Sequence, residues 1–169
     1  MKKIGIFFGS ETGKTAKVGQ KIKDAIDDYA EVDIISIEDA SAKDFEKYDN
    51  IIAGASTWFD GELPTYWDEL LPDLETLKMK GKKVAIFGLG DQKKYPDNFA
   101  DGVGILGGFF ESNGAKLIGF TSTEGYKFDH SAAVRDNKFL GLVIDYENQA
   151  DKNESRISEW VKQLKKELN

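Results

Sequence analysis

The feature that most constrains the fold is the regular alternation of short, continuous apolar runs with amphipathic segments. Five such runs are present: Ile4–Phe8, Val32–Ile37, Ile51–Gly54, Val84–Phe87 and Leu117–Phe120. Apolar runs without polar alternation are typical of parallel strands that are covered on both faces. The segments between them place apolar residues at helical spacing, as in Val18, Ile22 and Ile26. This alternation predicts a doubly wound α/β domain with a five-stranded parallel sheet and helices on both faces.

One long segment interrupts the alternation in the last third of the chain. Residues 121–138, TSTEGYKFDHSAAVRDNK, are mostly polar, and the strand-like run FLGLVID follows them. A connection of this length is uncommon inside a compact domain and is usually functional or inserted. We predict a single domain over residues 1–169 with an insertion at about 121–138. The sequence leaves the roles of this insertion and of His130 open.

The cysteine and histidine content excludes several kinds of active centre. The chain has no cysteine and one histidine, His130. Disulfides, iron–sulfur clusters and thiolate catalysis are therefore excluded. Histidine-based haem sites, zinc sites and Ser-His-Asp triads have little to be built from. Any redox chemistry must come from an organic cofactor.

The net charge and the first residues indicate where the protein acts. A net charge of −7 argues against nucleic acid and anionic membranes as partners and favours docking against basic surfaces. The apolar run near the start is too short for a signal peptide. No stretch approaches the roughly 18 apolar residues that a membrane span requires. We predict a cytoplasmic protein without membrane insertion.

The loop after the first apolar run, GSETGKT at residues 9–15, has the composition of a phosphate-binding turn. It is one residue too short for a Walker A loop. It nevertheless follows a strand and opens a helix, so free backbone amides and the positive helix end converge there with the hydroxyls of Ser10, Thr12 and Thr15. This arrangement suits a terminal phosphate monoester. The alternative is a plain strand-to-helix turn with a Ser or Thr cap.

A second glycine pattern, GVGILG at residues 102–107, matches the dinucleotide-binding fingerprint letter for letter. That fingerprint requires a strand immediately before it, whereas the segment YPDNFAD stands here. Val103, Leu106 and Phe110 are instead spaced as on one face of a helix. We interpret the glycines as residues that allow this helix to approach the sheet closely.

Two further loops leave strand ends, and each carries an aromatic residue. Trp58 follows the run IIAGA, and Tyr95 follows VAIFG. In open α/β sheets, ligands lie beyond the carboxyl ends of the strands, at the switch point between strands one and three. Both aromatic side chains are therefore expected close to the phosphate-binding turn. Together these features describe a site for a phosphorylated flat ring.

With these motifs, the whole chain resembles a flavodoxin of the long-chain type. The pattern SxTGxT at residues 10–15 resembles the loop that binds the FMN phosphate in that family. STWFDGELPTYWDE and GLGDQKKYPDNFADGVGIL resemble its two flavin-stacking loops, and the segment from GFTSTEG onward resembles the long-chain insertion and C-terminal helix. The resemblance implies a flavodoxin-like sheet with strand order 2-1-3-4-5, in which the insertion interrupts the last strand.

The resemblance also implies which residues bind FMN. Six residues would wrap the phosphate: Ser10, Glu11, Thr12, Gly13, Lys14 and Thr15. Trp58 and Tyr95 would flank the isoalloxazine ring, and either Asp145 or Glu147 would reach the ribityl chain. The polar edge of the ring would be contacted by Asn98 and by the backbone of the two aromatic loops, at Thr57, Trp58, Phe59, Asp60, Gly61, Leu89, Gly90 and Asp91. Ser56 is a further cofactor-binding candidate. Phe59 and Asp60 occupy positions that vary in the family and would tune the redox potential.

The function implied by the resemblance is that of a low-potential, one-electron carrier with non-covalently bound FMN. It would be a monomer that shuttles between the semiquinone and the hydroquinone. Its partners would be redox proteins with basic docking surfaces, namely reductase or photosystem type donors and low-potential acceptors. A flip of the Phe59 carbonyl, eased by Gly61, would supply a hydrogen-bond acceptor at flavin N5. Nearby carboxylates would disfavour the hydroquinone anion: Asp60, Glu62, Asp91 and Asp97.

Two other functions share this fold class. An FMN-dependent NAD(P)H:quinone oxidoreductase is the alternative that stays open, although the chain has no genuine dinucleotide fingerprint and only two arginines for a 2′-phosphate. A flavin-free receiver domain needs acidic residues after strand one and an aspartate after strand three, where Gly9-Ser10 and Ala55-Ser56 stand instead. The sequence therefore predicts an electron-transfer protein rather than an enzyme.

Overall fold

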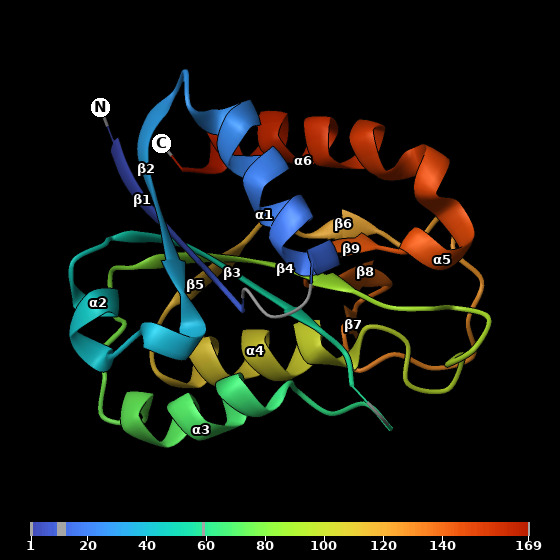
Figure 1. Cartoon of the computed structure of the whole chain (residues 1–169), viewed down its shortest axis with the longest axis horizontal. Helices are drawn as coiled ribbons and strands as arrows, with labels where there is room; N and C mark the ends of the chain where they lie inside the picture. Colours follow the sequence, from blue (N-terminus) through green and yellow to red (C-terminus); the bar gives the residue numbers. More distant parts are fainter. Residues whose placement is uncertain (1, 10–12, 59, 169) are drawn as a thin grey trace.

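A parallel β-sheet forms the middle layer of the protein and carries helices on both faces (Figure 1). The structure is a computed structural model, and it describes residues 2–9, 13–58 and 60–168. The strands are β1 (Lys2–Phe8), β2 (Ala30–Ser36), β3 (Asn50–Ser56), β4 (Lys83–Leu89), β5 (Lys116–Ile118), β6 (Thr121–Ser122), β7 (Val134–Arg135), β8 (Lys138–Phe139) and β9 (Gly141–Ile144). The helices are α1 (Gly13–Ile26), α2 (Ala42–Glu46), α3 (Thr65–Leu74), α4 (Asp101–Ser112), α5 (Tyr146–Gln149) and α6 (Asn153–Glu167), with the 3₁₀ turns η1 (Ile37–Asp39) and η2 (Ala150–Lys152). Among these described elements, no helix has the length and apolar character needed to cross a membrane.

The strand order of the sheet is β2-β1-β3-β4-β5, and β9 also pairs with β4. All of these pairs are parallel. β5 pairs with the first part of β4, up to the register pair Ala85 and Ile118, and β9 continues from the pair Ile86 and Gly141. The edge position of the sheet beside β4 is thus filled by two strands, β5 and β9, which residues 119–140 separate in the sequence. This arrangement confirms the predicted strand order and the interruption of the last strand.

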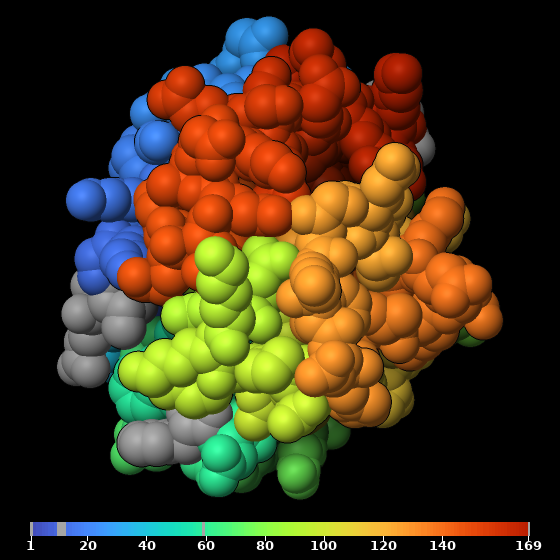
Figure 2. All heavy atoms as spheres, turned by 90° about the vertical axis from the view of Figure 1, so that its right-hand side faces the viewer, coloured from blue at the N-terminus to red at the C-terminus, as the bar shows by residue number. Residues whose placement is uncertain are grey.

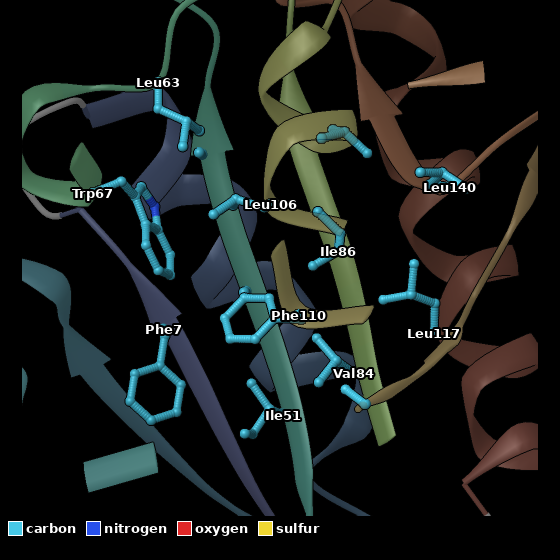
Figure 3. Packing of buried hydrophobic residues seen from close by; sticks show 14 of the residues in the cluster. Phe7, Ile51, Leu63, Trp67, Val84, Ile86, Leu106, Phe110, Leu117 and Leu140 are labelled. Carbon is cyan, nitrogen blue, oxygen red and sulfur yellow. The ribbon is translucent and has the colours of Figure 1, made fainter. Parts of the chain in front are cut away.

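The helices divide between the two faces, and side chains of each strand alternate between them. α1 and α6 cover one face, whereas α2, α3 and α4 cover the other (Figure 1). On the second face, the ring of Phe7 stacks on that of Phe45, with 3.9 Å between the ring centroids. Trp67 and Phe110 lie over β3 and β4 on the same face (Figure 3). Three β1 side chains point the opposite way, toward α1 and α6: Ile4, Ile6 and Phe8.

The edge strand is interrupted after β5, where Gly119 turns the chain out of the sheet. Its φ of +82° lies in the left-handed region that glycine adopts readily. β5 therefore ends at Ile118, two residues before the predicted strand end at Phe120. Residues 119–140 then form a small antiparallel sheet in the order β6-β8-β7.

The glycine-rich segment 102–107 lies within α4, as its helical spacing predicts. A Cβ atom on Gly102 would lie 3.2 Å from the carbonyl oxygen of Ser56, at the end of β3. A Cβ atom on Gly104 would lie 2.1 Å from the carbonyl oxygen of Ala132. The glycines therefore allow close approach to the sheet, as expected, and additionally let the segment 119–140 pack against the helix backbone.

Candidate functional site

A cleft of about 710 Å³ lies beside the N-terminus of α1 and the carboxyl ends of β3, β4 and β9. This volume is within the range of about 300–1,000 Å³ that is typical of small-molecule sites. The cleft lies where β1 and β3, which are neighbours in the sheet, connect to opposite sides, as expected for a doubly wound fold. Four segments of the chain line it: Gly13, Lys14, Thr15, Ser56, Thr57, Trp58, Leu89, Gly90, Asp91, Lys94, Tyr95, Tyr146 and Glu147.

The first wall of the cleft is the N-terminal turn of α1. Gly13 begins the helix, and Thr15 in the same turn is fully buried. The amides of a first helical turn have no partners within the helix and, with the helix dipole, attract an anion. A Cβ atom on Gly13 would meet no described atom within 4 Å. The other predicted phosphate-binding residues, Ser10, Glu11 and Thr12, lie outside the described residues.

An ion pair joins this turn to the opposite wall. The ammonium group of Lys14 contacts the carboxylate of Glu147, which belongs to α5. Both side chains are about half exposed, so water screens the pair and it contributes little to stability. The pair nevertheless places one cation and one carboxylate at the rim of the cleft.

The structure separates the two acidic candidates that the sequence left open. Glu147 lines the cleft, whereas Asp145 is fully buried and is not among the described lining residues. Asp145 caps α5: it accepts hydrogen bonds from the backbone amides of Gln92 at 3.0 Å and Asn148 at 3.1 Å. The side-chain amides of the same two residues also donate to it. Asp145 therefore links the segment around Gln92 to the first turn of α5.

The second wall is the loop after β3, which is closed by a pair of backbone hydrogen bonds. Trp58 and Glu62 each donate an N–H to the other's carbonyl oxygen at 2.7 Å. Gly61 has a φ of +87°, which residues with a Cβ atom rarely adopt. Asp60 at the tip of the loop is exposed, and Phe59 lies outside the described residues. The closed base holds the backbone of Trp58 in place.

The ring of Trp58 is held at the cleft by its neighbours. It meets the ring of Tyr66 edge to face, with 5.9 Å between the centroids and an angle of 83° between the planes. Thr57, next to it, accepts a hydrogen bond on Oγ1 from the backbone amide of Gly102 at 3.0 Å. α3 and α4 therefore both position this aromatic wall.

The third wall is the loop between β4 and α4, residues 90–99, which we call the Tyr95 loop. Asp91 organises it: its Oδ1 accepts hydrogen bonds from the amides of Lys93 at 3.1 Å and Lys94 at 2.9 Å. Burial raises the pKa of Asp91, but hydrogen bonds from the Lys94 amide, the Asn148 side chain and the Lys93 amide outweigh this effect, and the pKa falls below its usual value. Asp91 is therefore ionised at neutral pH. Tyr95 is 39% exposed, and the Lys94 ammonium lies 5.5 Å from its ring centroid.

Residues 119–140 hold the Tyr95 loop from outside the cleft. Figure 2 shows the loop in yellow-green, between the orange segment 119–140 and the red-orange segment that follows β9. The carbonyl oxygen of Pro96 accepts hydrogen bonds from the amides of Asp129 at 2.8 Å and His130 at 2.9 Å. His130 contributes its backbone here, and its side chain is exposed. The ring of Phe99 packs among three aromatic rings of the segment: Tyr126, Phe128 and Phe139.

Gln92 connects the Tyr95 loop to both of its neighbours. Its side-chain oxygen accepts a hydrogen bond from the amide of Lys127 at 2.7 Å, and its side-chain nitrogen donates to Asp145 at 2.8 Å. Only 5% of Gln92 is exposed, so the loss of these bonds would leave buried polar groups without partners. Gln92 therefore couples the segment 119–140, the Tyr95 loop and α5.

Two buried hydroxyl groups of the cleft residues have no hydrogen-bond partner within the part of the chain that the structure describes. They are the Oγ atom of Ser56 and the phenolic oxygen of Tyr146. Leaving a buried polar group unpaired costs about 1–3 kcal/mol. A ligand with polar groups would supply the missing partners.

The sequence-based candidates and the lining residues overlap but are not identical. Tyr146 and Lys94 line the cleft without being candidates. Tyr146 has a recognisable signal, an aromatic residue directly after the last apolar run, and Lys94 directly precedes an aromatic candidate. Asp60, Gly61 and Asn98 are not among the described lining residues. A Cβ atom on Gly61 would lie 3.2 Å from that of Asn98, so these two residues pack on each other.

The charges of the cleft define the ligand that it can hold. The helix N-terminus and Lys14 make one end attractive to an anion. Asp91 lines another part of the cleft, Glu147 is paired with Lys14 at the rim, and Asp60 and Glu62 are exposed on the neighbouring loop. Within the described residues, no group of His, Asp or Glu side chains could hold a metal ion. The arrangement fits an organic ligand with a flat ring and an anionic end.

Comparisons of sequence agree on one family. The Flavodoxin family model matches residues 6–160 of the chain. The chain is 48% identical over 169 residues to the flavodoxin of Trichodesmium erythraeum, with 99% of both chains covered. It is 44% identical over 168 residues to the flavodoxin of Synechococcus elongatus, again with 99% of both chains covered.

Comparisons of structure give the same result. The chain is similar to the crystal structure of Fusobacterium nucleatum flavodoxin bound to flavin mononucleotide, with a TM-score of 0.94 and 32% identity over 99% of both chains. It is also similar to oxidised Flavodoxin 2 from Bacillus cereus, with a TM-score of 0.76 and 28% identity over 98% of this chain and 99% of that one.

Proposed function

The chain belongs to the flavodoxin family, and from this premise we propose that it carries single electrons at low potential between partner proteins. Its cofactor is FMN, as in the flavodoxin whose structure with FMN it resembles. The FMN is held without a covalent bond, and the chain has no cysteine thiol that could form one. We place the carrier in the cytoplasm as a monomer.

The residues of the cleft fit FMN. The volume of about 710 Å³ accommodates a ring system with a phosphorylated side chain. The N-terminal turn of α1, which lines the cleft, suits the phosphate, and the partly exposed rings of Trp58 and Tyr95 lie at the same cleft. The hydroxyls of Ser56 and Tyr146, which have no partner among the described residues, add two sites for polar groups of the cofactor.

Each wall then has a part in binding. The first turn of α1, with Gly13 and Lys14, binds the phosphate, together with the preceding loop. Trp58 and Tyr95 sandwich the ring and exclude water from its faces. Glu147, rather than the buried Asp145, is the acidic residue that reaches the ribityl chain.

Bound FMN supplies one-electron redox chemistry between its partly and fully reduced states. The protein sets the potential of that chemistry through charge. Asp91 and Glu147 line the cleft, and hydrogen bonds keep Asp91 ionised. Because like charges repel more strongly where water is excluded, the Asp91 carboxylate disfavours a further negative charge on the cofactor and lowers the potential.

The loop between Trp58 and Glu62 supports a backbone change during the redox cycle. Its base is closed by two hydrogen bonds, and Gly61 provides a residue with wide backbone freedom near the tip. The expected flip of the Phe59 carbonyl stays a prediction, since Phe59 lies outside the described residues.

The observation that carries the proposal is the meeting, in one cleft, of the N-terminal turn of α1 and two aromatic side chains from separate loops. The test is a titration of the purified holoprotein with dithionite, followed by visible absorbance. A carrier shows yellow protein that passes through a distinct one-electron-reduced spectrum before it bleaches. A single two-electron step, together with rapid reduction by NADPH alone, would favour the FMN-dependent NAD(P)H:quinone oxidoreductase instead.

The site assignment has its own test, the affinity of the apoprotein for FMN. Tyr95→Ala should weaken binding about tenfold, because an aromatic contact contributes about 0.5–1.5 kcal/mol beyond the area that it buries. Tyr29→Ala, which removes a partly buried tyrosine in the turn after the C-terminal end of α1, is the matched control. Equal losses in the two variants would contradict the assignment.

The partners that we propose carry basic docking surfaces, as expected of reductase or photosystem type donors and of low-potential acceptors. The net charge of −7 supports this, since complementary charges accelerate encounter. Electron transfer to such a partner should slow as ionic strength rises, because salt screens exposed charges over about 8–10 Å.

A further inference from the structure

A second hollow in the surface lies on the other side of Trp58. It is a groove of about 550 Å³ between α3 and the segment that begins with η1, and we call it the Trp58 groove. Its lining residues are Ile37, Glu38, Ala40, Trp58, Thr65, Tyr66, Glu69, Leu70 and Asp73. Among the residues that the structure describes, Trp58 alone lines both this groove and the cofactor cleft.

The groove is negatively charged on its rim. Three of its described lining residues carry carboxylates, Glu38, Glu69 and Asp73, and none is a lysine, arginine or histidine. Glu69 and Asp73 stand one turn apart on α3, a spacing at which like charges repel. Within the described residues, neither of these two forms an ion pair. A cation from outside would relieve this repulsion.

The floor of the groove is apolar, in contrast to its rim. Ile37 is 2% exposed, and Tyr66 and Leu70 are 7% exposed. An apolar floor under an anionic rim fits a side chain with an aliphatic stem and a charged end, which is the character of lysine and arginine. The ring of Trp58 at one end adds a surface that attracts such cations.

We propose that the Trp58 groove receives a lysine or arginine side chain of the protein that exchanges electrons with this chain. The proposal rests on the proposed carrier function and adds the place where the partner is seated. The partner then touches the same tryptophan that forms a wall of the cofactor cleft. Docking at the groove therefore places the partner next to the cofactor, rather than anywhere on the acidic surface.

The experiment measures electron transfer from the reduced holoprotein by stopped flow, with two acceptors as probes. One is a lysine-rich c-type cytochrome, and the other is ferricyanide, a small anion that has no side chain to insert. The test variant Glu69→Gln/Asp73→Asn removes two charges from the groove. The matched control Asp24→Asn/Glu154→Gln removes two exposed charges from α1 and α6, on the opposite face of the sheet.

We expect slower electron transfer only in the variants of the groove, and only to the cytochrome. At low ionic strength, the groove variant should reduce the cytochrome about three- to tenfold more slowly, and the control should change this rate less than twofold. With ferricyanide, neither variant should slow the reaction, because the removal of negative charge does not hinder the approach of an anion. Thr65→Lys, which places a cation on the same stripe of α3, should slow the cytochrome reaction at least as much because it fills the groove from within.

Four outcomes would overturn the proposal. Equal slowing by the groove and control variants would mean that only the net charge matters. Unchanged cytochrome rates in the groove variants, with a change in sedimentation, would mean that the groove joins two copies of this chain. A protein that binds no flavin, or reduces neither acceptor, would refute the carrier function itself and the groove with it, whereas normal reduction of both acceptors by all variants would refute the groove alone.

Discussion

The backbone contact between α4 and the segment 119–140 makes a sharp prediction for two glycines of the same helix. A Cβ atom on Gly104 would lie 2.1 Å from the carbonyl oxygen of Ala132, whereas a Cβ atom on Gly108 would meet no described atom within 4 Å. The substitutions Gly104→Ala and Gly108→Ala are therefore identical in chemistry and differ in what surrounds the new methyl group.

The magnitude follows from the geometry. A carbon and a carbonyl oxygen ordinarily stay about 3.3 Å apart, so the Ala132 carbonyl would have to retreat by roughly 1 Å. Hydrogen bonds hold it in place, from the Ala132 amide to Asp101 at 2.7 Å and from the Leu140 amide to Ala133 at 2.8 Å. Overpacking of this kind costs about 1–3 kcal/mol, and exchange of a helical glycine for alanine returns about 1 kcal/mol.

We therefore expect the free energy of unfolding to differ between the two variants by about 1–3 kcal/mol. Gly108→Ala should be more stable than the wild type by about 1 kcal/mol, and Gly104→Ala should lie at or below the wild type. Each kcal/mol corresponds to about 2–4 °C in Tm for a chain of this size. Urea unfolding of the apoprotein, followed by circular dichroism, measures the difference.

The refuting result is equally plain. If Gly104→Ala gains as much stability as Gly108→Ala, α4 and the segment 119–140 do not pack backbone to backbone. A titration with FMN adds a second readout, because displacement of the segment 119–140 should also loosen the Tyr95 loop. Weaker FMN binding by Gly104→Ala but not by Gly108→Ala is the expected pattern.

Three further predictions concern single side chains. Gln92→Leu removes hydrogen bonds to Asp145 and to the segment 119–140, so FMN should bind about five- to tenfold more weakly in a fluorescence titration; an equal loss in Gln20→Leu, on the exposed side of α1, would contradict this. Asp91→Asn removes a charge from the cleft and should raise the lower flavin potential by about 20–60 mV in spectroelectrochemistry, and an unchanged potential would show that this carboxylate does not act on the cofactor. Burial raises the pKa of Tyr126 to about 12 from 10.0. The neutral phenol therefore makes its full contribution to the free energy of unfolding below pH 10, and this contribution is lost as the pH rises from 10 to 12. Tyr126→Phe should flatten the stability curve over that interval, as measured by urea unfolding, and an unaltered slope would refute the assignment.

Much of the fold could be predicted because parallel strands covered on both faces leave an unmistakable apolar pattern. The run Ile51–Gly54 lies within β3, and Val84–Phe87 lies within β4. The divided edge strand was less predictable, since the backbone conformation of Gly119 decides where β5 ends. β6, β7 and β8 have two residues each, too few for any periodicity, and pairing within the segment 119–140 determines them instead.

The candidate site could likewise be predicted only in part from the sequence. Trp58 and Tyr95 could be placed together because both follow strands whose carboxyl ends share one edge of the sheet. The different surroundings of Asp145 and Glu147 could not be predicted, because two acidic residues so close in sequence look alike until the capping of α5 is known. The contact of Lys14 with Glu147 joins residues 133 positions apart, and no local pattern encodes it.

The contact between α1 and α6 affects how the protein folds during synthesis as well as its final structure. α1 and α6 contact each other and together cover one face of the sheet (Figure 1). α6 leaves the ribosome after every strand, so during translation the apolar side chains beneath it are exposed to other molecules. Ile157, Trp160 and Leu164 must arrive before that face is closed. The nascent chain therefore passes through an interval in which aggregation competes with folding, and the final helix ends it.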